Sequence, residues 1–274
     1  RELAPSGFRV DLKRTTDGTL LFISSGNAEN IDPAKRGFGF IITFSKGGVD
    51  GPWEEICVYK KGRQIDGNAS WTWPRASPKA PEINYRADAS DDNHARRFDC
   101  EMSDPTFVEL DDGTAIIGYR GTQCAWDYHG GDHFKEVPAF LVAQSWRGPY
   151  QRMGTKVLGD NADAEDMYMW RSARGVHMLY HHMGKEYGDL YKKLRGGYAF
   201  TADKTGLCGW QTTDDEAWPS YLAFDNCSVL TIAKRQRPSF VFDENRAAPT
   251  HLVTGVSTTL DGVKWGDGWT VVQP

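Results

Sequence analysis

The feature that most constrains this sequence is a strand–turn–strand unit that occurs four times. Its clearest copy runs from Ser103 to Arg120, where two apolar runs flank the turn Asp112-Gly113. Asp-Gly between apolar runs is a strong hairpin signal, because glycine adopts the positive φ that a tight turn requires. Nine positions before each turn stands a polar residue that opens the unit. We call these four the opening residues: Arg9, Asp104, Asp166 and Arg237.

A further strand follows in three of the units, at residues 38–44, 138–145 and 197–201. Two of these strands continue into a Gly-Pro-aromatic segment, Gly51-Pro52-Trp53 and Gly148-Pro149-Tyr150. Each unit therefore predicts a four-stranded antiparallel sheet. Repetition of such sheets is how a β-propeller avoids long exposed edges. The expected fold is all-β, a β-propeller of four-stranded antiparallel blades with four visible repeats, in a single domain of residues 1–274.

The repeats are interrupted once, by a Pro-rich, polar stretch between Cys57 and Cys100. We interpret residues 58–100 as a long loop insertion, and insertions of this size usually form a lid or a binding loop. The best helix candidate, Tyr187–Leu194, is a weak one. Few residues follow His251, so the N-terminal segment could complete the last sheet.

Composition and charge exclude several classes of function. A net charge of −5 argues against nucleic acid or an anionic membrane surface as partner, since neither polyanion is attracted. No apolar run reaches the length of a membrane span. The first residues lack an apolar signal-peptide core, so either no signal is present or the chain begins after processing or within a larger precursor. The sequence does not predict an oligomeric state.

The 5 cysteines are scattered without a metal-ligand spacing, and they allow at most two internal disulfides with one thiol left over. Two sequons, Asn68-Ala69-Ser70 and Asn226-Cys227-Ser228, would make the chain a glycoprotein in a eukaryotic secretory pathway. The aromatic content of 12% is high. We assign most aromatic side chains to the sheet core, and some to exposed surfaces on which sugar rings stack.

The innermost strands of a propeller begin around one end of its channel, so the opening residues should converge there. Two carboxylates with two guanidiniums suit a polyhydroxylated or anionic ligand. Paired carboxylates are also what glycoside hydrolysis requires, one as acid and the other as base or nucleophile. The alternative is structural, because such charges also form salt bridges that hold blades together.

Histidines offer a second cluster, at His129, Asp132 and His133, which are close enough for a metal site in a loop. Solvated loop residues are the commoner explanation, and we expect no cofactor, although a structural cation such as calcium is compatible with the acids. His181 and His182 alternate on a strand, so they should face opposite sides and not ligate one metal.

Several motifs resemble the five-bladed propeller glycosidases of the arabinanase and xylosidase type, glycoside hydrolase family forty-three and its relatives. The resemblance is carried by the strand openings at Asp104–Phe107, Ala164–Trp170 and Arg237–Asp243. The segment Ser145–Tyr150 resembles the S-x-x-G-P-[WY] pattern that closes blades in that group. More narrowly, Pro249–Val256 is similar to uncharacterised secreted members from algae and other microbes.

The resemblance implies a five-bladed plan, of which four repeats are visible here, and three carboxylates from successive blades that act as base, pKa modulator and acid. By position, Asp104 matches one aspartate, and Asp166 or Glu165 matches another member of the set. The sequence departs from the family pattern at Arg9, where an acid is expected, and no S-E-G-P segment supplies the acid glutamate.

We therefore expect a secreted, glycosidase-like propeller whose partner is a polysaccharide or glycoside. Asp104 and Asp166 form the expected catalytic pair, with Glu165 as alternate acid. The rival is a propeller of the same stock that cleaves nothing and binds carbohydrate or serves assembly. The expected substrate-binding residues are Arg9, Arg120, Arg237, Trp71, Trp73, Trp126 and His181.

Overall fold

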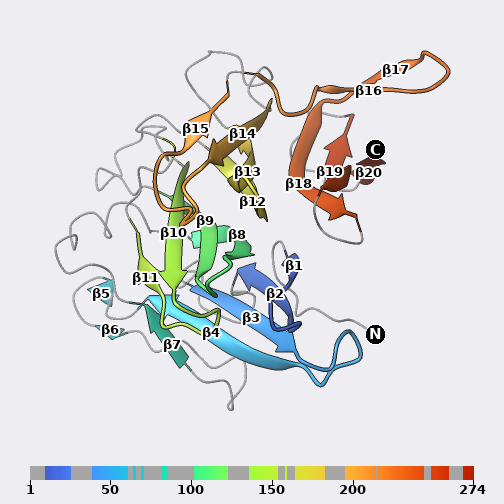
Figure 1. Cartoon of the computed structure of the whole chain (residues 1–274). Helices are drawn as coiled ribbons and strands as arrows, with labels where there is room; N and C mark the ends of the chain where they lie inside the picture. The colour runs from blue at the N-terminus through green and yellow to red at the C-terminus, as the bar shows by residue number, and fades with distance from the viewer. Residues whose placement is uncertain are drawn as a thin grey trace. The chain divides into compact units, whose positions relative to one another are not determined.

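The computed structural model of this chain is built from β-strands (Figure 1). It describes residues 10–25, 39–60, 64–65, 69–70, 82–85, 102–122, 136–153, 158, 164–182, 195–213, 215–243, 248–258 and 268–274. Within these ranges every regular element is a strand, so the expected all-β class is confirmed. None of the described residues forms a helix with the length and hydropathy of a membrane span. The helix candidate Tyr187–Leu194 lies outside the described residues.

The first sheet has the strand order β1-β2-β3-β4-β7. Its strands are β1 (Val10–Arg14), β2 (Leu20–Ser25), β3 (Gly39–Ser45), β4 (Glu54–Lys60) and β7 (Glu82–Tyr85). The first four pair antiparallel in chain order, as the repeated unit predicts, and β7 joins β4 in parallel. The insertion at 58–100 is thus not without secondary structure. It supplies β7 and the short hairpin of β5 (Gln64–Ile65) and β6 (Ala69–Ser70).

The second sheet contains the predicted hairpin of residues 103–120. Its strands are β8 (Met102–Glu109), β9 (Ala115–Thr122), β10 (Glu136–Ala143) and β11 (Gln151–Arg152), all antiparallel. Gly113 has φ 85° in the turn between β8 and β9, so the predicted use of glycine is confirmed. The turn is closed by a 2.8 Å bond from the Leu110 N–H to the Thr114 carbonyl. Asp112 Oδ1 accepts the Thr114 N–H at 2.9 Å.

The first two sheets share a hydrophobic core. Their facing strands contribute aliphatic side chains and several aromatic rings, including the pairs Phe40–Tyr119 and Phe44–Trp146 with centroids 5.4 and 4.8 Å apart. All four rings are at most 6% exposed. Burial of one such side chain contributes about 1.5–3 kcal/mol, so this core stabilises β8, the strand that carries Asp104.

The third sheet is four-stranded and the fourth is three-stranded, all antiparallel. The third comprises β12 (Ala164–Ser172), β13 (Gly175–His182), β14 (Arg195–Thr201) and β15 (Gln211–Thr212). The fourth comprises β18 (Lys234–Phe242), β19 (Pro249–Ser257) and β20 (Trp269–Gln273). A core of Tyr168, Leu179 and Trp218 packs against aromatic and aliphatic residues of both sheets, among them Phe240 and Leu252.

An additional hairpin, which the repeat did not predict, precedes the fourth sheet. It pairs β16 (Tyr221–Ala223) with β17 (Val229–Thr231). On one face Leu222 packs with Ile232 and Val256. The other face leaves Tyr221 48% and Val229 63% exposed.

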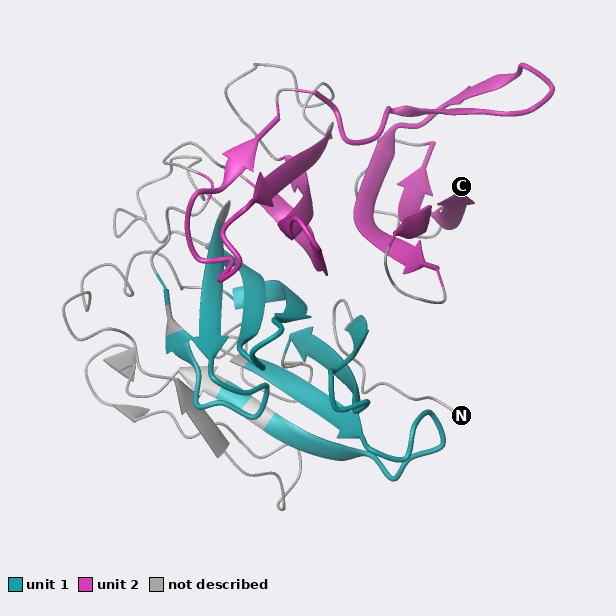
Figure 2. Ribbon diagram, viewed as in Figure 1, with its two compact units in different colours: residues 1–156 teal, residues 157–274 magenta. Residues whose placement is uncertain are grey.

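The chain divides into two compact units, residues 1–156 and 157–274 (Figure 2). The first contains sheets one and two, and the second contains sheets three and four together with the additional hairpin. Cys208 and Cys227 are exposed free thiols, so neither is in the expected disulfides. The side chains of Cys57, Cys100 and Cys124 lie outside the described residues.

Candidate functional site

Three of the four opening residues have the same unusual backbone. Asp104, Asp166 and Arg237 have φ of 50, 55 and 56°, in the left-handed region that L-residues rarely adopt. At each one the register with the next strand shifts, between Ser103 and Thr106 in β8 and at the corresponding points of β12 and β18. Such a bulge bends a strand and re-aims a side chain. The repeat therefore extends to the backbone conformation of the opening residues.

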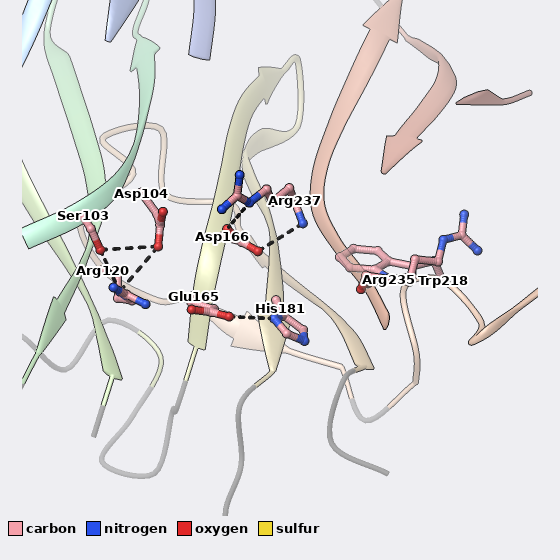
Figure 3. Close-up of polar contacts among 9 residues, drawn as sticks. All are labelled: Ser103, Asp104, Arg120, Glu165, Asp166, His181, Trp218, Arg235 and Arg237. Atoms are coloured by element: carbon pink, nitrogen blue, oxygen red, sulfur yellow. Dashed lines mark hydrogen bonds and ion pairs between the residues drawn. The ribbon is translucent and has the colours of Figure 1, made fainter. Parts of the chain in front are cut away.

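Asp104 lies in the first unit within a small polar cluster (Figure 3). Arg120 donates from Nε to Ser103 Oγ at 2.7 Å, and the same Nε is 3.4 Å from Asp104 Oδ2. Ser103 Oγ also bonds Asp104 Oδ2 at 3.4 Å. The side chain of Asp104 is 11% exposed, so the cluster is largely but not fully sheltered from solvent. Asp104 and Arg120, both predicted as site residues, are thus brought together.

Asp166 and Arg237 pair in the second unit, where β12 and β18 contact each other (Figure 3). The backbone N–H of Arg237 donates to Asp166 Oδ2 at 3.2 Å, and Arg237 Nε lies 3.9 Å from Oδ1. Asp166 is buried, whereas the Arg237 side chain is 42% exposed. Both carboxylate oxygens of Asp166 therefore face donors from the next opening residue.

Glu165 lies beside this pair and contacts His181 across the β12–β13 ladder (Figure 3). His181 Nδ1 is 3.1 Å from Glu165 Oε1. The His181 side chain is 1% exposed and that of Glu165 is 16% exposed. Among the described residues, no group bonds the buried Nε2 atom of His181. Sequence reasoning named both residues but did not pair them.

Glu165, Asp166 and His181 are the one group of three potential metal ligands found among the described residues, with ligand atoms within 4.8 Å of one another. The donors are mixed oxygen and nitrogen, whereas calcium takes six to eight oxygen ligands. Asp166 already faces the guanidinium of Arg237, which competes with a cation for the same carboxylate. The set therefore does not fit the calcium ion considered from the sequence. His129, Asp132 and His133 lie outside the described residues.

One acid that the sequence analysis did not select ties the first two sheets together. Asp11 Oδ2 accepts from Thr106 Oγ1 at 2.8 Å and from the Phe107 N–H at 3.2 Å. Lys13 Nζ lies 3.4 Å from the same oxygen. Asp11 is buried and committed to the opening strand of the second sheet, so it has a structural role. The neighbouring opening residue, Arg9, is not among the described residues.

A second buried polar residue that the sequence did not reveal is Arg235, which is 2% exposed. Its guanidinium donates to Thr254 Oγ1 at 3.1 Å and to the Pro219 carbonyl at 3.0 Å, and it also bonds Gln273 Oε1. Trp218 Nε1 donates to the Arg235 carbonyl at 3.4 Å (Figure 3). These acceptors are uncharged, and burial lowers the pKa of the Arg235 guanidinium. Arg235 therefore binds the segment before the additional hairpin to the fourth sheet.

The remaining predicted site residues are not placed by the structure. Trp71, Trp73 and Trp126 lie outside the described residues, so their stacking role stays a prediction. Asp104 and Asp166 belong to different compact units, and each is described within its own. Their expected convergence at one end of a channel also stays a prediction.

Comparison with solved structures identifies the fold. A thermostable family-43 glycoside hydrolase matches 97% of this chain and is itself covered over 70% of its length, with TM-score 0.51 and 12% identity. The Bombyx mori family-32 β-fructofuranosidase matches with TM-score 0.50 and 12% identity, over 97% of this chain and 47% of its own. The fold is thus that of the β-propeller glycoside hydrolases, as expected.

A third similar structure shows how the lengths compare. The chain spans 43% of the exo-β-1,3-galactanase of Phanerochaete chrysosporium, with which it shares 12% identity at a TM-score of 0.47. No family profile and no curated protein matches this chain in sequence. At these identities the likeness concerns the fold alone, so the chemistry has to be argued from the residues.

Proposed function

We propose that this chain acts on a polysaccharide or glycoside by acid/base hydrolysis with carboxylates at its strand openings. The observation that carries the proposal is the shared left-handed backbone of Asp104, Asp166 and Arg237. Non-glycine residues in this region cost free energy and concentrate at active sites, where they aim side chains. The fold supports the same conclusion, because it is the fold of propeller glycoside hydrolases.

The surroundings of the three acids suggest separate roles. Asp166 is buried and its oxygens face donors from Arg237. Such a carboxylate is suited to hold charge near the reacting carbon. Glu165 is more exposed, with 16% of its side chain accessible, and its Oε1 lies 3.1 Å from Nδ1 of His181. We therefore assign Glu165, the alternate acid of the sequence analysis, as proton donor, with Asp104 and Asp166 as the base and the charge-stabilising partner.

The rival function, carbohydrate binding without cleavage, is favoured by one observation. Asp104 and Asp166 each lie next to an arginine, Arg120 and Arg237. Ion pairs of this kind can hold strands in place without any chemistry. The rival function keeps carbohydrate as the partner, because arginine and carboxylate side chains both form hydrogen bonds with sugar hydroxyls.

The test is release of reducing sugar from a panel of plant and algal glycans, combined with glycan binding in an affinity gel. Wild type should release sugar, and Glu165→Gln, Asp104→Asn and Asp166→Asn should each lose at least about 100-fold in kcat. Asp225→Asn is the matched control, because Asp225 is an exposed acid in the additional hairpin. Retained glycan binding with no release by wild type would refute hydrolysis and support the rival function.

Action on a polymer outside the cell requires an extracellular protein, and secretion remains part of the proposal. Asn226 lies on the exposed turn of the additional hairpin, where its Oδ1 accepts from Ser228 Oγ at 2.6 Å and from the Ser228 N–H at 3.0 Å. This sequon is therefore accessible for a glycan if the chain passes through a eukaryotic secretory pathway. A mass shift removed by glycosidase treatment of the native protein would show it, and an unmodified secreted Asn226 would exclude it.

A further inference from the structure

His181 is the buried partner of the proposed acid, and its side chain is less exposed than that of the acid. The side chain is 1% exposed on β13 and faces Glu165, its cross-strand neighbour on β12. Two charged groups of the described residues lie close to this contact, Asp166, which follows Glu165, and Arg237 of β18, which pairs with Asp166. The only group that the structure bonds to the imidazole among the described residues is Glu165 Oε1, at 3.1 Å from Nδ1.

The opposite ring nitrogen decides where the imidazole carries its proton. Nε2 of His181 is buried and has no hydrogen-bond partner among the described residues. A buried N–H without an acceptor is rarer and costs more than an acceptor that lacks a donor. The neutral ring is therefore expected to hold its proton on Nδ1, from which it donates to Glu165 Oε1. A ring that donates at Nδ1 fixes which oxygen of Glu165 carries a transferable proton, because Oε1 already accepts.

We propose that His181 is a positioning residue for Glu165 and directs proton transfer to the glycosidic oxygen from Oε2. This inference rests on the proposed function. In the step, the proton on Glu165 Oε2 moves to the leaving oxygen, and the bond between that oxygen and the anomeric carbon breaks with its electron pair on the oxygen. The anomeric carbon then receives the oxygen of a water molecule, whose proton goes to the second carboxylate. The Nδ1–H bond remains on Oε1 throughout and stabilises the Glu165 carboxylate that forms.

Three substitutions at position 181 separate positioning from packing. An asparagine amide N–H lies near the place of Nδ1, whereas the amide of glutamine extends to the place of Nε2. His181→Asn should therefore keep most of the activity, and His181→Gln and His181→Ala should lose about 10–100-fold in kcat with a smaller change in KM. His251→Ala is the control, because His251 lies on β19 and bonds Thr250.

Substrates with different leaving groups distinguish positioning of the acid from a merely structural role, because only positioning affects the two substrates unequally. A nitrophenyl glycoside leaves without protonation, so general-acid assistance contributes little to its cleavage. The loss in His181→Gln should be confined to the natural glycan or an alkyl glycoside, and it should shrink to less than about threefold on the nitrophenyl substrate. Equal losses on both substrates would show that His181 only supports the fold, and would overturn the proposal.

The tautomer gives a second test that does not depend on activity. In the full chain labelled with ¹⁵N-histidine, long-range ¹H–¹⁵N spectra assign the protonated nitrogen of His181, with His181→Asn used to identify the signal. The expected result is a proton on Nδ1 whose resonance moves in Glu165→Gln. A proton on Nε2 would refute the positioning role even if the protein hydrolyses glycans. A proton on Nδ1 in a wild type that cleaves no glycan would instead refute the proposed function alone.

Discussion

The buried ring of His177 makes the stability of the second unit depend on pH. The ring is 4% exposed and stacks on Trp170, with centroids 4.8 Å apart and an interplanar angle of 10°. Nε2 bonds Ser172 Oγ and Nδ1 bonds the Tyr198 hydroxyl, both at 2.7 Å. Burial, and secondarily the charge of Arg174, lower the pKa of His177 from 6.5 to about 4. The folded protein therefore keeps this ring neutral where the unfolded chain protonates it.

The sign and size of the effect follow from that difference. Between pH 6.5 and about 4 the unfolded chain binds one more proton at His177, so the free energy of unfolding falls as the pH falls. The contribution is fully present above pH 6.5 and lost by about pH 4. Its total is about 3 kcal/mol at about 1.4 kcal/mol per pH unit. That is a large fraction of the 5–15 kcal/mol typical of a domain.

The assay compares urea unfolding of the full wild-type chain and His177→Gln from pH 7.5 to 4, followed by tryptophan fluorescence. Gln cannot titrate, so the free energy of unfolding of wild type minus that of His177→Gln should fall by about 3 kcal/mol as the pH drops. Contributions from carboxylates are the same in both proteins and cancel in this difference. His251→Gln is the matched control, because it removes a histidine whose ring is not buried. A difference between the two free energies of unfolding that does not change with pH, or a His177 proton signal that titrates above pH 6, would refute the reasoning.

Three further variants test other features of the fold. Arg235→Met should cost about 2–4 kcal/mol in urea unfolding, because buried acceptors lose a charged donor; a cost below about 1 kcal/mol would contradict its role. Gly196→Ala should cost about 1–3 kcal/mol, since its Cβ would lie 2.2 Å from the Trp218 ring. Gly255→Ala, with no atom nearer than 3.7 Å, is the matched control, and equal costs would refute the steric argument. Arg237→Gly should keep or raise the stability by up to about 1 kcal/mol and weaken glycan binding; unchanged binding would count against a ligand role.

The repeat could be predicted from the sequence because turn chemistry is local. Glycine at a position of positive φ, as at Gly113, is required by the turn itself and fixes where both flanking strands begin. Counting back from the turns found Asp104, Asp166 and Arg237, and all three have the same backbone. Their left-handed φ could not be predicted, since none of them is glycine and a bulge leaves no composition signal.

Contacts between residues that are distant in the sequence could not be predicted, because they depend on strand register and on the packing of separate segments. Glu165 meets His181 only through the register of β12 against β13, which shifts just after Glu165. A shift of one residue would place the two side chains on opposite faces. The burial of Arg235 could not be predicted either, because an arginine in a strand is normally expected to be exposed. Its burial depends on acceptors from Pro219, Thr254 and Gln273, far apart in the sequence.

The left-handed backbone of Arg237 has a free energy cost that can be compared with the contacts of its side chain. A non-glycine residue in the left-handed region costs about 1–2 kcal/mol. The ion pair of the Arg237 side chain with Asp166, at 3.9 Å and with the arginine 42% exposed, returns at most about 1 kcal/mol. The stronger contact is the backbone N–H of Arg237 to Asp166 Oδ2, and glycine would keep it without the strain. Arg237→Gly would therefore relieve the backbone cost and keep this backbone contact, so that a loss of glycan binding in this variant would be due to the missing guanidinium.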